Sequence, residues 1–118
     1  MGLPFSTLVI DQARAVPLAE ALRRFKLDFQ VDESYVSQQY PDSRLFLVNL
    51  DGQVRRIVIT GPKWFDLDTG FGQGGAIDLG IYLLKAPFAR VVRFLIPPQP
   101  KKKRYADEQE RYYNPYDL

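Results

Sequence analysis

Three carboxylates in the middle of the chain are the strongest candidates for chemistry. Asp66, Asp68 and Asp78 could hold Mg²⁺ through oxygen ligands, and the first two share a face of an extended run. Carboxylates beside glycine turns also act as caps and turn formers, and we favour that interpretation. The chain has no cysteine and no histidine, so it lacks thiolate ligands, the commonest zinc ligand and the commonest general base. We therefore predict no metal site, no cofactor and no enzymatic activity.

A second group of residues has the types that bind single-stranded nucleic acid. Lys63, Trp64 and Phe65 place a cation beside two aromatic rings on an expected strand, with Arg55 and Arg56 nearby. In such groups bases stack on aromatic faces while cations follow the phosphates. Because neighbouring strand residues face opposite sides, we expect at most one of the two rings to be exposed. The alternative is structural, with Trp64 half in the core and Lys63 simply solvated.

The C-terminal stretch, residues 97–118, is unlike the rest of the chain. A proline-rich segment that is typical of stiff linkers opens it. Four contiguous bases and three tyrosines follow: Lys101, Lys102, Lys103, Arg104, Tyr112, Tyr113 and Tyr116. The bases could track phosphates while the tyrosines stack on nucleotide bases. Alternatively, the tyrosine-rich end docks into a groove of a partner protein, or the stretch is only a solvated extension.

Length, charge and hydrophobicity limit the classes of protein to which the chain can belong. The 118 residues carry a net charge of +2, and residues 1–96 hold eleven Lys/Arg against ten Asp/Glu, so the body is nearly neutral. We expect one domain over residues 1–96 and a flexible tail over 97–118. No apolar run reaches the roughly 20 residues that a membrane span requires, and the start lacks a signal-peptide pattern. We therefore predict a cytoplasmic protein without a membrane partner.

The elements that must position the candidates begin with a helix and a hairpin. Apolar residues recur every three or four positions over 16–25, which predicts a helix with basic residues near its end. Two β-rich runs, 45–50 and 54–60, flank Asp51-Gly52, the strongest short hairpin signal. Residues 63–67 add a third strand.

Two flanking segments are less clear. Residues 2–12 are predicted to be either a packed arm or an edge strand, and residues 29–39 to hold a short strand around Tyr35. The residue types of 40–43 indicate a turn.

A glycine-dense turn joins the third strand to two further helices, predicted over 76–85 and 87–95. Its structural candidates are Gly72, Gly74, Gly75 and Asp78. Backbone N–H groups at a helix start can bind phosphate, but Asp78 in the first turn would repel an anion. We favour simple turn geometry. The whole pattern predicts an α+β fold, a small antiparallel meander of three or more strands covered by about three short helices.

From the third strand onward the chain resembles the closing part of the zinc-finger domain of bacterial-type DNA primases and of related domains in plasmid and integrative-element proteins. An aromatic strand, a glycine turn and a Gly-Gly-x-Ile-Asp-Leu helix start carry the resemblance. The matching residues are Trp64, Phe65, Gly72, Gly74, Gly75, Ile77, Asp78, Leu79 and Phe88. With the preceding helix and hairpin, the resemblance covers roughly residues 14–95.

The chain departs from that family in its zinc ligands. The family's knuckles would fall near residues 37–44 and 65–73, which contain neither cysteine nor histidine. A structural zinc site contributes on the order of 10 kcal/mol to folding. We expect aromatic packing to replace it, with these candidates: Phe46, Trp64, Phe65, Phe71, Phe88 and Phe94.

The resemblance implies a metal-free relative that keeps the scaffold and single-stranded template contact. A non-catalytic accessory of mobile-element replication or conjugative transfer that binds nucleic acid, with single-stranded DNA favoured, is therefore the first prediction. The alternative is an adaptor that docks a partner protein through its helical face or its C-terminal tail.

Overall fold

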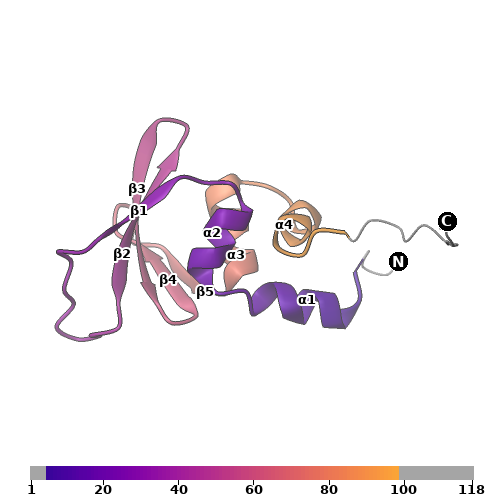
Figure 1. Ribbon diagram of the computed structural model, residues 1–118, viewed down its shortest axis with the longest axis horizontal. Coiled ribbons are helices and arrows are strands. Elements are labelled where there is room, and N and C mark those ends of the chain that lie inside the picture. The colour runs from indigo at the N-terminus through magenta and orange to yellow at the C-terminus, as the bar shows by residue number, and fades with distance from the viewer. Residues whose placement is uncertain (1–4, 99–118) are drawn as a thin grey trace, which may run out of the picture.

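An open antiparallel sheet is the centre of the molecule, and the computed structural model describes residues 5–98 (Figure 1). Its strands lie in chain order across the sheet: β1 (Phe29–Asp32), β2 (Arg44–Leu50), β3 (Gln53–Thr60), β4 (Lys63–Asp66) and β5 (Gly72–Gly74). Each strand pairs antiparallel with the next one along the chain. The predicted meander and the α+β class are confirmed, and the meander continues into the glycine-dense segment.

Two-residue loops set the register of the central strands. Asp51 and Gly52 have φ of 51° and 84°, so both adopt the left-handed conformation that suits the twist of a tight hairpin. Leu50 is therefore directly opposite Gln53. Gly61-Pro62 makes the next loop, with φ of 58° at Gly61.

The helices all lie on one side of the sheet: α1 (Thr7–Arg14), α2 (Leu18–Arg24), α3 (Ala76–Leu84) and α4 (Phe88–Leu95) (Figure 1). Pro17 and Pro87 stand immediately before α2 and α4, positions where a missing N–H costs no helical hydrogen bond. Within residues 5–98, no helix has the length and apolar character needed to cross a membrane.

Two flanking segments differ from the predictions. The N-terminal arm contains a helix, α1, whose start is capped by Ser6, which accepts a hydrogen bond from the Val9 N–H at 3.2 Å. The first strand lies at Phe29–Asp32 rather than around Tyr35. Asp32 ends it, because its carboxylate accepts hydrogen bonds from both the N–H and the hydroxyl of Ser34.

The core lies between the sheet and the helices, and the largest buried aliphatic side chains come from both layers: Leu22, Val48, Ile57, Leu79, Val91, Val92 and Leu95. Gly80 allows α3 to pack closely. A Cβ atom there would lie 2.5 Å from a Val91 methyl and 2.6 Å from the Phe25 ring. Glycine is required here by the close packing and not by its backbone conformation, since its φ is not in the left-handed region.

Candidate functional site

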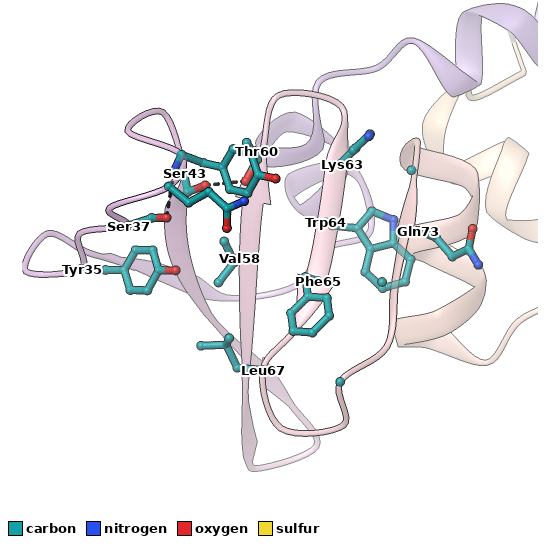
Figure 2. A pocket seen from close by; sticks show the side chains of 15 residues that line it. Tyr35, Ser37, Ser43, Val58, Thr60, Lys63, Trp64, Phe65, Leu67 and Gln73 are labelled. Carbon is teal, nitrogen blue, oxygen red and sulfur yellow. Dashed lines mark hydrogen bonds between the residues drawn. The ribbon is translucent and has the colours of Figure 1, made fainter.

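A groove of about 990 Å³ opens on the face of the sheet that the helices leave free (Figure 2). The connection between β1 and β2 forms one wall, β4 and β5 form the other, and Val58 of β3 lies on the floor. Figure 2 shows the Tyr35 ring across the floor from Phe65. The lining combines aromatic rings, hydroxyl groups, a lysine and bare glycine backbone: Tyr35, Tyr40, Phe65, Ser37, Ser43, Thr60, Lys63, Gly72 and Gly74.

Phe65 presents the exposed aromatic surface of the β4 wall. Its side chain is 43% exposed, and it stands opposite Gly72 of β5 on one side and Val58 of β3 on the other. A Cβ atom at Gly72 would lie 2.8 Å from the Phe65 ring and 3.0 Å from the Trp64 carbonyl oxygen. Only a glycine at this position lets the ring lie over the edge strand.

Trp64 is among the residues that line the groove (Figure 2), but its ring has almost no exposed surface, so it does not suit the stacking role that the sequence suggested. It is 2% exposed, and its indole N–H donates to the Gly75 carbonyl oxygen at 3.3 Å. Its ring packs against Phe71 and Tyr82 on the helical side, with centroid distances of 5.8 and 5.0 Å. The reason is strand parity: Trp64 pairs with the buried Ile59, so Phe65 takes the opposite face.

Both arginines of β3 are neutralised by carboxylates. Arg55 contacts Asp66 at 3.3 Å on the helical side. Arg56, on the groove side, donates two hydrogen bonds to Asp68 Oδ1, at 2.7 and 3.0 Å. The side-chain hydrogen bonds from Arg56, followed by the one from its backbone N–H, lower the pKa of Asp68 below its usual value.

The arginines therefore add little net positive charge to the groove. Lys63 is its remaining cation, and it pairs with no carboxylate among residues 5–98.

Asp66 is fully buried, and its carboxylate is occupied by hydrogen bonds and an ion pair within the fold. One carboxylate oxygen accepts the N–H groups of Asp68 and Thr69, at 2.8 and 3.3 Å. The other accepts the Tyr82 hydroxyl at 2.8 Å and contacts Arg55. The carboxylate thus holds the turn after β4, and in the described part of the chain no three potential metal ligands come together.

The glycine-dense segment contains a short strand and is not only a turn. Gly72 and Gly74 belong to β5, and Gly75 precedes α3 with φ of 87° and ψ of 155°, a conformation that is essentially restricted to glycine. The Gly75 N–H donates to the Pro62 carbonyl oxygen at 2.8 Å, so it is not available to a phosphate. Asp78 is exposed in the first turn of α3.

The remaining candidates, Lys101 to Arg104 and the tyrosines 112, 113 and 116, lie outside the described residues. Sequence reasoning missed Tyr35 and Tyr40 as groove residues. They lie in the polar connection between β1 and β2, and nothing in its residue types indicates that it packs beside the sheet. No family model, no curated protein and no solved structure matches this chain.

Proposed function

We propose that this protein is a non-catalytic binding protein for single-stranded nucleic acid, with unpaired bases held in the groove on the open face of the sheet. The observation that carries the proposal is the half-exposed Phe65 ring over Gly72, with Tyr35 across the floor and Lys63 beside it. Stacking on an aromatic ring holds any base, because every base has a π-face. A duplex hides those faces, so the groove favours single strands.

The groove carries little positive charge with which to bind phosphate. Lys63 is the one cation among the described residues that line the groove, and Arg56, on the same face of the sheet, is paired with Asp68. Base stacking must therefore supply most of the affinity at this surface. The resemblance to primase zinc-finger domains suggests the setting, an accessory protein of mobile-element replication or conjugative transfer, with single-stranded DNA as the favoured ligand.

Fluorescence anisotropy with labelled single- and double-stranded oligonucleotides tests the proposal, using the full-length chain. Phe65→Ala is expected to weaken single-strand binding by about tenfold, since stacking contributes about 1–3 kcal/mol per base. Val54→Ala is the control, because Val54 is 58% exposed on the same face but does not line the groove.

Two further variants separate stacking from general apolar contact. Phe65→Tyr should retain affinity because it keeps an aromatic ring, while Phe65→Leu should lose most of it. Equal binding by Phe65→Ala and the unchanged protein, or a preference for duplex, would overturn the assignment of this groove.

An adaptor function is the second candidate, and the edge strand β5 favours it. The Gly75 N–H donates to the Pro62 carbonyl just before β4, and the Phe71 carbonyl accepts from the Asp66 N–H of β4. Because inward and outward groups alternate along a strand, the N–H and C=O groups of Gly72 and Gly74 point away from β4. An extended peptide could add there as a further strand. In that case Phe65→Leu would retain binding to the partner, and oligonucleotides would not compete.

A further inference from the structure

A second hollow, of about 360 Å³, lies where α2 and α4 end, in the helical layer. Four basic side chains line it together with Phe94 and Pro97: Arg23, Arg24, Lys26 and Arg93. The hollow is formed by residues that are distant in the chain. Arg24, at the end of α2, donates a hydrogen bond of 2.6 Å to the Leu95 carbonyl oxygen, at the end of α4.

Charge is distributed unevenly between the helical layer and the sheet. Residues 5–26 and 76–98, which include all four described helices, carry seven Lys/Arg and three Asp/Glu, whereas residues 29–75 carry four Lys/Arg and six Asp/Glu. The near-neutral total therefore hides a basic helical side and an acidic sheet side. An anionic ligand is attracted to the helical side, where the hollow lies.

The positive charge of the hollow is only partly neutralised by carboxylates, although Arg23 lies over the Phe29 ring and Arg93 over the Phe5 ring. Glu20 accepts hydrogen bonds from Arg23 and Arg24, at 3.2 and 3.1 Å, and Arg24 also caps α4. Lys26 and Arg93 pair with no carboxylate within residues 5–98. Cations near a helix C-terminus interact favourably with the negative end of the helix dipole. Each end is equivalent to only about half a negative charge, so two helix ends do not neutralise four cations.

Lys26 occupies a position where glycine is the usual residue. It has φ of 61°, and the N–H groups of Lys26 and Leu27 bond to the carbonyls of Arg23 and Leu22, closing α2 in a Schellman motif. A lysine in the left-handed conformation is strained, whereas a glycine there is not.

Three of the four cations that line the hollow are arginines. Arginine is suited to phosphate because its planar group can form two parallel hydrogen bonds.

We propose that the hollow at the ends of α2 and α4 binds backbone phosphates of the same single strand whose bases occupy the sheet groove. This inference rests on the proposed function and deepens it by separating the phosphate site from the base site. The groove supplies stacking with little net charge, and the hollow supplies the charge.

Lys26→Gly in the full-length protein is the central test, with Lys85→Gly as its matched control. Lys85 has φ of 51° at the end of α3 and does not line the hollow. Both variants should raise the melting temperature, because both relieve a left-handed lysine. Only Lys26→Gly should weaken oligonucleotide binding, by about threefold at low salt, and reduce the slope of log affinity against log salt by about 0.7.

A combined Arg23→Gln, Lys26→Gln and Arg93→Gln variant should lower the slope by about 2. Equal effects of Lys26→Gly and Lys85→Gly on binding would overturn the hollow while leaving the groove in place. Loss of affinity in the hollow variants but not in Phe65→Ala would instead overturn the groove and keep the hollow. Binding to phosphatidylserine vesicles with none to oligonucleotides would overturn both.

Discussion

The groove on the sheet and the hollow among the helices are both concave, but they differ in how they treat charge. On the groove side of the sheet, Arg56 is paired with Asp68, and the groove itself presents aromatic and glycine surface. In the hollow, Glu20 pairs with Arg23 and Arg24 only, and two further basic residues pair with no carboxylate within residues 5–98. The first surface suits flat uncharged groups and the second suits anions.

This difference shows why net charge is a poor guide to binding in this chain. Residues 1–96 have a net charge of +1, which averages an acidic sheet and a basic helical layer, and residues 97–118 add the other +1. Salt should therefore weaken the two contacts unequally, since screening acts on charges and hardly on stacking. The predictions below test this division, from the largest expected effect to the smallest.

Asp66→Ala should have the largest effect. It removes the buried acceptor for Arg55, Tyr82 and two backbone N–H groups, which should lower the free energy of unfolding by about 3 kcal/mol. Urea unfolding measures the change, and hydrogen exchange should show its greatest increase at the groove wall, in residues 67–74. Asp68→Ala is the control, with a far smaller change because that pair is exposed. Similar midpoints for the two variants would contradict the role given to Asp66.

Gly75→Ala should come next, at about 1–3 kcal/mol, because φ of 87° with ψ of 155° is strained for any other residue. Gly74→Ala provides a matched comparison one residue away. Gly74 does not have a positive φ, and a Cβ atom there would lie 3.7 Å from the Pro62 carbonyl oxygen, an ordinary contact. Thermal unfolding of the two variants should differ clearly, and equal melting temperatures would refute the account of this corner.

Gly72→Ala should change the wall of the groove, since a Cβ atom there would lie 2.8 Å from the Phe65 ring and 3.0 Å from the Trp64 carbonyl oxygen. The added methyl group would displace the Phe65 ring, so single-strand affinity should fall by about fivefold with an unchanged salt slope. Anisotropy titrations at several salt concentrations measure both quantities. A reduced salt slope would show that the groove also holds phosphate, and the contrast between the two surfaces would fail.

Glu20→Gln should have the smallest effect and the opposite sign. Hydrogen bonds from Arg24 and then Arg23 lower the pKa of Glu20, so it is ionised at neutral pH and offsets part of the positive charge in the hollow. Its neutralisation should raise oligonucleotide affinity about twofold at low salt. Asp32→Asn, which removes a carboxylate of the sheet side, is the comparison. Equal gains from both changes would mean that the hollow has no special part.

Most of the sheet was predictable because its signals are local. Asp51-Gly52 fixed the hairpin, and the alternation of Trp64 and Phe65 meant that only one ring would be exposed. The α1 helix was missed because its apolar run of Leu8, Val9 and Ile10 also suits a strand, and Ser6 as its cap was overlooked.

The two surfaces themselves were not predictable in full. The pairing of Arg56 with Asp68 depends on the register between β3 and β4, which sequence spacing alone does not give. The hollow brings Arg24 next to Leu95, 71 residues away, through helix packing that depends on Gly80. Such contacts follow from the tertiary arrangement rather than from any local pattern.

The packing of α1 against α4 has a consequence for how the chain folds during synthesis. Phe5, before α1, meets Phe88 of α4 with ring centroids 6.4 Å apart, so the first described residues contact nearly the last. The meander can form early from neighbouring hairpins, which are fast to close. The apolar side of α2 can be buried only after α3 and α4 have left the ribosome, because it packs against both helices. We expect nascent chains that stop before residue 88 to leave this apolar side exposed, and to bind chaperones until α4 has been synthesised.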